Sequence, residues 1–461
     1  MTATLLAQAL RLAEDYLHGL PERPVAARAT AAELGAALGG PLPEAPGDAA
    51  AVLAALARGV DPGLVATAGP RYFGFVTGGS LPVAVAADWL TATWDQNAAL
   101  YAMSPAAAVV EQVVAGWLTA LFGLPSGTSV GLVTGAQMAN VTALAAARHE
   151  VLRRAGWSVA EDGLDGAPPL TLIVGGEAHV TVWAALKLLG FGARRVRPVG
   201  VDGQGRMRPA ELAAALRGAD GPTIVCAQAG NVNSGASDPF DALLPLVRER
   251  PNAWFHIDGA FGLWAAVSPS LAAQVRGHAG ADSWATDGHK WLNVPYDSGI
   301  VMVAHPEAHA AAMGRQAPYL VAGAADERSG MLWAPEASRR ARGFALWAAL
   351  RALGRSGVVE LVERCCRLAR RMAERLRAPG VEILNDVVLN QLLVRFVPPS
   401  GGAADEWTRE VIARVQRDGT CWLGGTVWQG RAAMRISVSN WSTTEADIDR
   451  SATAILAAAR G

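Results

Sequence analysis

Residues 253–291 read "AWFHIDGAFGLWAAVSPSLAAQVRGHAGADSWATDGHKW", and two short apolar runs within this stretch each end at an aspartate. The runs at 253–258 and 282–287 have the length and composition of strands that are buried on both faces. Similar runs, most of them separated by segments of helical length, lie at 129–134, 170–175, 194–200, 222–228 and 299–304. This alternation predicts an α/β fold with a mostly parallel central sheet covered by helices on both faces.

The two flanks of this central region have different patterns. Residues 1–80 predict short helices separated by turns such as "GGPLPEAPGD", with a strand-like pattern only at "RYFGFVTGG", and they have little core of their own. Residues 81–335 are the expected large α/β domain. Residues 336–461 begin with two long helical stretches at 336–353 and 357–377 and continue with short strands and helices, which predicts a small C-terminal α+β domain.

Bulk composition excludes several classes of protein. The chain has 461 residues, a formal net charge of -1 and no basic run, so nucleic acid is not an expected partner. The charge-free stretch from 112 to 147 is long enough to resemble a membrane span, but "GLPSGTS" interrupts it, and we interpret it as core helix, turn, strand and helix. The N-terminus lacks a signal-peptide pattern, and the four cysteines form neither a disulfide framework nor a zinc spacing, which favours the cytoplasm.

Lysine usage marks one position as chemical. Lysine and arginine together number 40, yet lysine occurs only at Lys187 and Lys290. A lysine that arginine cannot replace is one whose amine must lose its proton and attack a carbonyl group. Lys187 lies in the middle of the predicted helix 179–190 and is interpreted as structural, so Lys290 is the candidate for this chemistry.

In parallel α/β sheets, ligands bind beyond the carboxyl ends of the strands. The strand at 129–134 leads into a helix whose first amides, at Ala136 and Gln137, form an anion site suited to a phosphate. His179 begins another helix after a strand, where its ring can lie flat over an aromatic ligand. A buried aspartate such as Asp258 needs a cationic partner.

The next strand end delivers Asp287, His289 and Lys290. Taken together, the strand ends supply the groups that pyridoxal 5'-phosphate needs. The phosphate would lie at the helix N-terminus, the ring would stack on His179, Asp258 would keep the pyridine nitrogen protonated, and Lys290 would form a covalent imine.

The chain resembles the pyridoxal-phosphate-dependent group II amino acid decarboxylases, which include the aromatic amino acid and glutamate decarboxylases. The resemblance follows the order of the family over most of the length, and its segments are "GPRYFGFVTGGSLP", "SPAAAVVEQVVAGWL", "TGAQMAN", "EAHVTVWAA", "FHIDGAFG", "DGHKWLNVPYDSG" and "MRISVSNW". It implies a fold-type I enzyme, similar to aspartate aminotransferase, that converts an L-amino acid to the amine and CO2. It also implies a homodimer with active sites at the interface, in which the N-terminal segment wraps the partner.

The resemblance also implies roles for individual residues. Lys290 would carry the cofactor, with His289 contacting phosphate or substrate, Ala260 beneath the ring and His179 above it. Asp287 stands where many relatives have Asn or Ser, and its carboxylate would repel the phosphate unless a backbone amide lies between them. The remaining candidates are Ala136 and Gln137 for the phosphate, Asp258 for the pyridine nitrogen, Asn231 or Asn233 in place of a threonine hydroxyl, and Phe75, Thr77 and Arg435 for the substrate.

Other interpretations remain open at this stage. Arg435 is as consistent with a salt bridge between domains as with a carboxylate site. Aromatic decarboxylases use a loop tyrosine as a proton donor, but residues 327–344 contain none and Tyr319 is interpreted as structural, so transamination or oxidative deamination to an aldehyde is the alternative chemistry. His256 with Asp258 and Asp287 with His289 could instead bind a metal in a hydrolase, and a cofactor-free interaction protein is the non-catalytic alternative.

Overall fold

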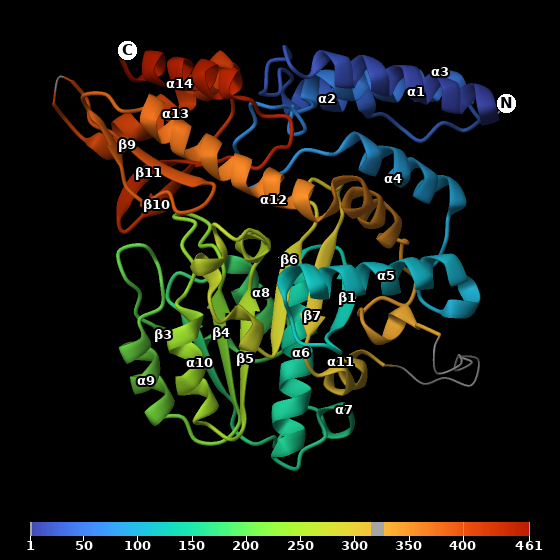
Figure 1. The fold of residues 1–461 in the computed structure, drawn as a ribbon. Helices are drawn as coiled ribbons and strands as arrows, with labels where there is room; N and C mark the ends of the chain where they lie inside the picture. Colours follow the sequence, from blue (N-terminus) through green and yellow to red (C-terminus); the bar gives the residue numbers. More distant parts are fainter. Residues whose placement is uncertain (1, 315–326, 400, 461) are drawn as a thin grey trace.

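The structure, a computed structural model, describes residues 2–314, 327–399 and 401–460. Within these ranges a seven-stranded sheet forms the centre of the molecule, in the order β1-β7-β6-β5-β4-β2-β3 (Figure 1). Its strands are β1 (Ser129–Val133), β2 (Thr171–Gly175), β3 (Val196–Val199), β4 (Thr223–Gln228), β5 (Ala253–Asp258), β6 (Ser283–Asp287) and β7 (Gly299–Val303). All seven strands expected from the apolar runs are therefore confirmed.

The sheet is mostly parallel. Strands β6, β5, β4, β2 and β3 run parallel to their neighbours, and only β7 runs antiparallel, between β1 and β6. Since β1 and β6 both oppose β7, they share one direction. The carboxyl ends of β1, β2, β4, β5 and β6 therefore lie at the same edge of the sheet, where a ligand is expected.

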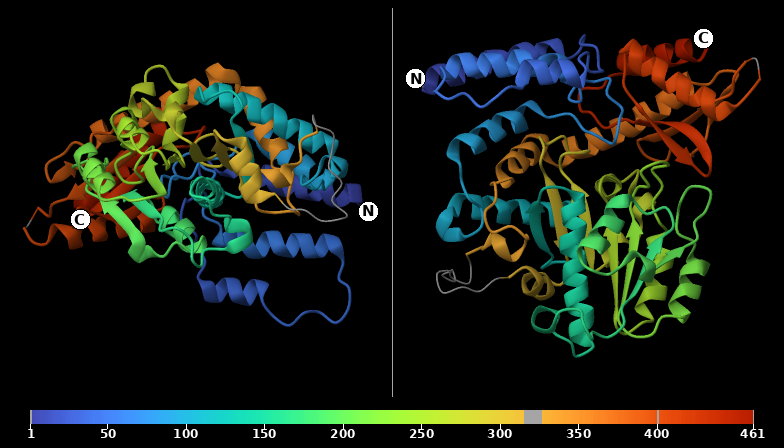
Figure 2. Two further views of the ribbon diagram at one scale, coloured as in Figure 1. Left: turned by 90° about the horizontal axis from the view of Figure 1, so that it is seen from below. Right: turned by 180° about the vertical axis from the view of Figure 1, so that it is seen from behind.

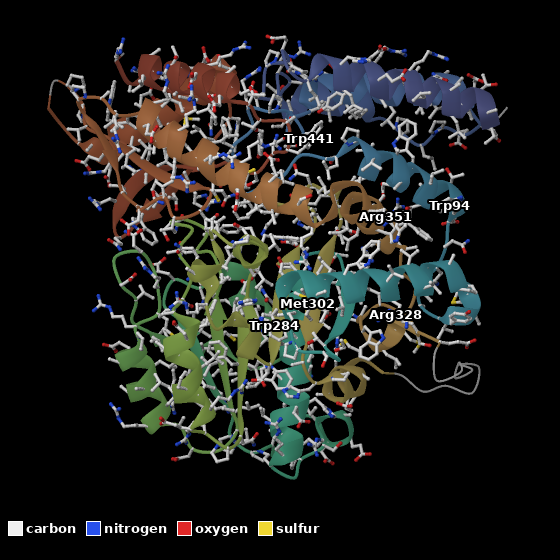
Figure 3. The ribbon with its side chains drawn as sticks, in the orientation of Figure 1. Trp94, Trp284, Met302, Arg328, Arg351 and Trp441 are labelled. Carbon is white, nitrogen blue, oxygen red and sulfur yellow. The ribbon has the colours of Figure 1, made fainter. Side chains whose placement is uncertain are left out.

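Helices cover both faces of this sheet, as the sequence predicts. Alternate residues of each strand belong to two separate apolar clusters: Ile224 and Cys226 of β4 face one cluster, and Val225 and Ala227 face the other. One face is covered by α6 (Ala136–Arg154), α8 (Val180–Leu188) and α11 (Pro306–Met313), and the opposite face by α5 (Pro105–Phe122), α9 (Pro209–Arg217), α10 (Phe240–Arg248) and α12 (Gly343–Arg375). The short α7 (Val159–Asp162) follows α6. Trp284 and Met302, paired across β6 and β7, lie in the interior of the second face (Figure 3).

The C-terminal part has a separate antiparallel sheet in the order β10-β11-β9-β8. Its elements are β8 (Val381–Ile383), β9 (Gln391–Phe396), α13 (Ala404–Asp418), β10 (Gly424–Trp428), β11 (Arg431–Ser437) and α14 (Glu445–Arg460). The two long helical stretches expected before this sheet are largely in α12, which breaks at Gly354, where the left-handed φ of 60° is accessible to glycine; the first seven residues of the expected stretch 336–353 precede the helix and are not helical. The α+β character of this part is confirmed, whereas the boundaries at residues 80 and 335 stay a prediction.

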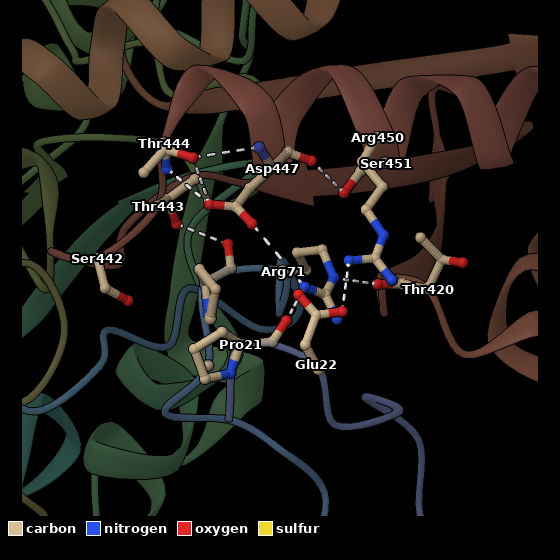
Figure 4. A network of polar contacts seen from close by, with 12 residues as sticks. Pro21, Glu22, Arg71, Thr420, Ser442, Thr443, Thr444, Asp447, Arg450 and Ser451 are labelled. Atoms are coloured by element: carbon tan, nitrogen blue, oxygen red, sulfur yellow. Dashed lines mark hydrogen bonds and ion pairs between the residues drawn. The ribbon is translucent and has the colours of Figure 1, made fainter. Parts of the chain in front are cut away.

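The N-terminal residues form three helices that have no buried residue: α1 (Thr2–Gly19), α2 (Ala31–Leu38) and α3 (Ala49–Val60). They lie side by side along one edge of the molecule, near α14 and above α4 (Pro82–Trp94), in the front view and from behind (Figures 1 and 2). The buried Arg71 ties the segment after them to the C-terminal sheet, because its guanidinium donates to the carbonyl oxygens of Pro21 and, at 2.6 Å, of Thr420 (Figure 4).

The segment 71–79, which has a strand-like pattern in the sequence, is not a strand. A single bridge joins Tyr72 to Trp422 among the described residues. The segment passes between the two sheets so closely that a Cβ atom at Gly78 would collide with the backbone oxygen of Lys290, and one at Gly74 with the ring of Trp422. Tertiary contacts therefore override the local pattern.

Helix α5 is, among the described residues, the one helix long and apolar enough to cross a membrane by length and composition alone. A buried helix of an ordinary core passes the same test, and α5 packs against the sheet through Val114, Leu118 and Leu121. The expected sequence of core helix, turn, strand and helix over residues 112–147 is confirmed by α5, β1 and α6.

Candidate active site

A cavity of about 240 Å³ opens at the carboxyl edge of the large sheet. Six of the residues proposed from the sequence line it, and they come from both sheets and the N-terminal segment: Phe75, His179, Asp258, Ala260, Lys290 and Arg435. These residues are up to 360 positions apart in the chain, Phe75 to Arg435, so the fold alone brings them together.

Lys290 and the start of α6 meet through Asp287. The Lys290 Nζ lies 3.1 Å from Asp287 Oδ2, and the Ala136 amide at the first residue of α6 donates to Asp287 Oδ1 at 2.7 Å. A backbone amide thus does contact this carboxylate, at the helix end where a phosphate was expected. Gln137 is the second residue of α6, so the pair Ala136 and Gln137 lies at the N-terminus as predicted, with the electrostatic preference for anions of that helix end.

His289 is held in one tautomer beside Lys290. The backbone N–H of Ser298 donates to His289 Nδ1 at 3.1 Å, so the hydrogen of the neutral ring is on Nε2, which lies 3.4 Å from Asp287 Oδ1. Burial lowers the pKa of His289, which favours this neutral form. The ring of Tyr296 stacks on His289 with centroids 4.2 Å apart.

His179 is also a neutral ring at the cavity. It caps the N-terminus of α8, and its Nδ1 accepts from the Thr181 hydroxyl at 2.8 Å and the Thr181 amide at 3.4 Å. Burial, and then the positive charges of Lys290 and Arg435, lower the pKa of His179 to about 4. A neutral imidazole fixed in this way is suited to stacking on an aromatic ring.

Asp258 ends β5 and is 5% exposed. Burial raises the pKa of Asp258 to about 6, although Lys290 and the Ala260 amide, which donates to Oδ1 at 3.3 Å, act in the opposite direction. A carboxylate that is buried to this extent needs a cation, and a protonated pyridine nitrogen is one.

The guanidinium of Arg435 on β11 makes no hydrogen bond or ion pair with any residue that the structure describes. Burial lowers the pKa of its guanidinium, because the surrounding atoms disfavour the charged form. The interpretation of Arg435 as a salt bridge between domains therefore has no support in the described part of the chain. An unpaired cation in a cavity is a site for an anionic ligand.

Seven sequence candidates lie outside the cavity lining: Ala136, Gln137, Asp287 and His289, whose positions are given above, and Asn231, Asn233 and Thr77. Asn231 Oδ1 accepts from the amides of Asn233 and Ser234, and its Nδ2 donates to the carbonyl of Glu177, so this side chain builds a turn. Asn233 Oδ1 accepts from Thr426, and Thr77 does not line the cavity either. The lining residues that sequence reasoning missed are Val76, Gln228, Gly230, Val232 and Phe261. Of these, only Gln228 had a signal, its position at the end of a predicted strand.

The metal interpretation is not supported. Among the described residues no group of three or more His, Cys, Asp or Glu side chains is placed to hold a metal ion. His256 has both ring nitrogens occupied, since Nδ1 lies 2.9 Å from Ser283 Oγ and Nε2 lies 2.9 Å from Asn140 Oδ1. Tyr319 lies outside the described residues, and Trp333 packs edge-on against His309 rather than lining the cavity.

The site residues fit pyridoxal phosphate on three observations. Lys290 supplies an amine, Asp258 is a buried carboxylate whose neighbouring cation among the described residues is Lys290, and His179 is a neutral ring on the cavity wall. The N-terminus of α6 lies within reach of Lys290 through Asp287. This set of donors and acceptors matches an aldehyde, a pyridine nitrogen, an aromatic ring and a phosphate.

Comparisons with known proteins agree with this arrangement. The family described as "Pyridoxal-dependent decarboxylase conserved domain" matches residues 35–396. The chain is 29% identical to tryptophan decarboxylase 1 of Oryza sativa subsp. japonica, over 84% of this chain and 79% of the relative. It is 27% identical to an acidic amino acid decarboxylase of Bos taurus, over 80% and 73%, and 27% identical to 4-hydroxyphenylacetaldehyde synthase of Rhodiola rosea, over 83% and 79%.

A solved structure shows the same fold. The structure of Oryza sativa TDC with PLP and tryptamine superposes with a TM-score of 0.92 at 24% identity and covers 99% of this chain and 97% of its own. The expected mostly parallel sheet with a separate C-terminal antiparallel sheet is therefore the fold of this chain and of that protein.

Proposed function

Because the chain belongs to the pyridoxal-dependent decarboxylase family, we propose that it converts an L-amino acid to the amine and CO2 with pyridoxal phosphate attached at Lys290. The observation that carries this proposal is the cavity that brings Lys290, Asp258 and Arg435 together. An amine for the cofactor aldehyde, a carboxylate for the pyridine nitrogen and an unpaired cation for a carboxylate are the groups that this reaction needs.

Different residues of the cavity bind the cofactor and orient the substrate. When bound, pyridoxal phosphate supplies an electron sink for the electron pair of a bond that breaks at the substrate α-carbon. Asp258 keeps the pyridine nitrogen protonated, which makes that sink effective, and His179 covers the ring. Lys290 would hold the cofactor through its amine, and Arg435 would bind a substrate carboxylate and so orient the bonds at the substrate α-carbon.

The phosphate group would lie at the N-terminus of α6. Helix amides and the helix dipole favour an anion at Ala136 and Gln137. Asp287 accepts a hydrogen bond from the Ala136 amide and forms an ion pair with Lys290. The negative charge of Asp287 is therefore partly compensated before a phosphate binds. His289 presents Nε2–H toward the same carboxylate and can donate to a phosphate or to the substrate.

Oxidative deamination to an aldehyde is the second candidate, because one relative is named an aldehyde synthase. That reaction also releases CO2, but it consumes O2 and water and yields an aldehyde, ammonia and hydrogen peroxide instead of an amine. Transamination would instead require a keto acid acceptor. The organic product, rather than CO2, therefore distinguishes the three reactions.

The experiment that tests the proposal uses purified protein, Lys290→Ala and, as a matched control, Lys187→Ala. Each is scanned for visible absorbance, treated with borohydride and digested to locate a reduced cofactor, and then incubated with aromatic and acidic L-amino acids. We expect the label at Lys290, loss of the absorbance in Lys290→Ala alone, and amine and CO2 in equal amounts from one substrate. Aldehyde with ammonia would favour the second candidate, and wild-type protein without a label would refute both. Tyr296→Phe and Tyr319→Phe are measured as two separate variants. Their rates of amine production show on which of the two hydroxyl groups the formation of the amine depends.

We also infer that the protein is a homodimer. Helix α1 exposes Leu6, Leu10 and Leu17, and α4 exposes Trp89 and Trp94. Helices α1, α2 and α3 contain no buried residue, and Tyr16 is the residue of α1 that packs on a small apolar cluster of its own chain, around Leu20 and Tyr72, so most of the apolar side chains of these helices stay uncovered. A second copy of this chain would cover these side chains, in agreement with the expected wrapping role of residues 1–80. A cytoplasmic location remains a proposal, supported by the four cysteines being free.

A further inference from the structure

A row of buried polar side chains lies behind Asp258, between the sheet and α6. Trp254 and His256 precede Asp258 on β5 by four and two positions, so all three point to the same face. Ser283 is the partner of His256 on the neighbouring β6, and Asn140 faces them from α6. Trp254, Ser283, His256 and Asn140, which we call the polar relay, are each 0% exposed. None of the four lines the cavity.

The hydrogen bonds of the polar relay have a fixed direction. Trp254 Nε1–H donates to Ser283 Oγ at 2.8 Å, and an indole nitrogen can only donate. Burial lowers the pKa of His256 to about 3, so the ring is neutral. An amide oxygen can only accept, so in the 2.9 Å bond between His256 and Asn140 Oδ1 the ring nitrogen Nε2 is the donor, and the neutral ring accepts at Nδ1 from the Ser283 hydroxyl, also at 2.9 Å.

This direction determines which end of Asn140 faces Asp258. Because Oδ1 accepts from His256, the NH2 group of Asn140 is the end that remains. Its Nδ2 is buried and lacks a hydrogen-bond partner among the described residues. No hydrogen bond of the described residues joins Nδ2 to Asp258, but the Asn140 amide is among the groups that lower the pKa of this carboxyl, against the larger effect of burial. Without the His256 donor the amide could rotate and present its oxygen to the carboxylate, which is repulsive.

We propose that the polar relay is a positioning device for the cofactor, in which Trp254, Ser283 and His256 fix the Asn140 N–H groups toward Asp258 and so keep this carboxylate ionised for the pyridine nitrogen. The inference rests on the proposed function, since it requires pyridoxal phosphate at Lys290. Asn140 and His256 act through Asp258 and are positioning residues.

The charges around Asp258 explain why such a device is needed. Burial disfavours the carboxylate, the negative charge of Asp287 acts in the same direction, and Lys290 is the neighbouring cation. The thiol of Cys226 on the adjacent strand is neutral, since burial raises its pKa to about 12. The reaction uses the amine of Lys290 to attach the cofactor, so its charge is not available throughout. Neutral donors that never react, Asn140 and the Ala260 amide, remain.

The test measures the protonation of the cofactor nitrogen directly. Holoenzyme is prepared with pyridoxal phosphate labelled with 15N in the ring, and the 15N shift is followed from pH 6 to 9 in wild type, Asn140→Leu and Ser283→Ala. We expect a protonated nitrogen in wild type and a deprotonation midpoint lowered by about one pH unit or more in Asn140→Leu, with a smaller shift in Ser283→Ala. We expect kcat of Asn140→Leu to fall about tenfold or more, with KM within about twofold of wild type.

Two controls separate positioning from structural damage. Thr142 lies on the same helix, is equally buried, and its hydroxyl bonds only the carbonyl of Met138, so Thr142→Val should leave the midpoint unchanged. Ser283→Thr retains the hydroxyl and should restore the wild-type midpoint. The inference is overturned if the midpoint does not move in Asn140→Leu or Ser283→Ala, or if Thr142→Val moves it equally. If Asn140→Leu does not fold, Ser283→Ala decides the matter, and wild type without label at Lys290 would instead refute the proposed function.

Discussion

Replacing Lys290 by arginine keeps a positive charge beside Asp287 but removes the amine that lines the cavity. Guanidinium stays protonated at any working pH and cannot form the bond to an aldehyde. Lys290→Arg should therefore lose the borohydride-fixed cofactor and about a thousandfold or more of kcat. Lys187→Arg should retain both within about twofold, since this side chain lies on α8 away from the cavity. Retained activity in Lys290→Arg would mean that another residue carries the cofactor.

The raised pKa of Asp258 makes the apoprotein sensitive to pH. Burial raises this pKa from 3.8 to about 6, so the folded state binds a proton more tightly than the unfolded state does. Stability from this group is fully present below about pH 3.8 and is lost as the pH rises through 6. From pH 4 to pH 7.5 the loss amounts to about 2 kcal/mol.

Asp258→Asn removes this titration. The free energy of unfolding of the apoprotein variant, relative to wild type, should therefore rise by about 2 kcal/mol between pH 4 and pH 7.5, as measured by urea denaturation. Asp238 is a second buried carboxyl group with which Asp258 can be compared, because burial also raises the pKa of Asp238 to about 6. Each of the two carboxylate oxygens of Asp238 accepts a hydrogen bond from a backbone amide, those of Met207 and Gln228. A difference that does not change with pH would show that Asp258 stays charged in the apoprotein.

For single residues, the sequence identified the chemically important side chains more reliably than it predicted which neighbours each side chain contacts. Lys290, Asp258 and His179 were identifiable because each stands at a strand end and carries a group that is costly to bury without a purpose. Asn231 and Asn233 were candidates only through the family resemblance, in place of a threonine hydroxyl, and their side chains are used in a turn and in a bond to the C-terminal sheet. The position of Val232 in the cavity has no sequence signal, because the direction of a loop side chain depends on tertiary packing.

Among the elements, α5 and the segment before α12 are joined by a buried ion pair. Arg339 donates to both oxygens of Glu111 at 2.6 Å, and both side chains are 1% exposed, while Arg328 lies 3.5 Å from the same carboxylate. Removing the acid leaves two guanidinium groups buried without their counter-charge. Glu111→Gln should lower the free energy of unfolding by about 3–5 kcal/mol.

The adjacent pair of Arg340 with Asp88 is a matched control for this prediction. It has a similar distance, 2.8 Å, but its side chains are 40% and 33% exposed. Asp88→Asn should cost no more than about 1 kcal/mol, because water replaces the lost interaction. Urea denaturation of both variants under the same conditions compares them. Equal costs would show that burial of the Glu111 pair does not determine its contribution.

The elements themselves were largely predictable. Continuous apolar runs marked six of the seven strands, because strands buried on both faces have no polar alternation to obscure them, whereas β3 at the edge of the sheet has two exposed residues, Arg197 and Pro198. The segment 71–79 was misleading because most of its side chains are buried, although Phe75 is exposed, and its partners are Trp422 and the backbone of Lys290 rather than a strand. Sequence patterns report burial and leave open which neighbour causes it.

For the whole molecule, the prediction concerns the surface of α1. Leu6 and Leu10 are one helical turn apart, 51% and 47% exposed, and they lie on a helix that has no buried residue. If a second copy covers this face, two glutamates there would place charges in an apolar interface. We expect wild type to sediment as a dimer and Leu6→Glu/Leu10→Glu to associate at least about 100-fold more weakly. Because the active site is expected at the interface, kcat should fall with the dimer fraction and recover at high protein concentration.

Arg11→Glu changes charge at an exposed position of the same helix and should leave the dimer intact. A wild-type monomer with full activity would contradict the dimer and leave the cavity as a site complete within one chain.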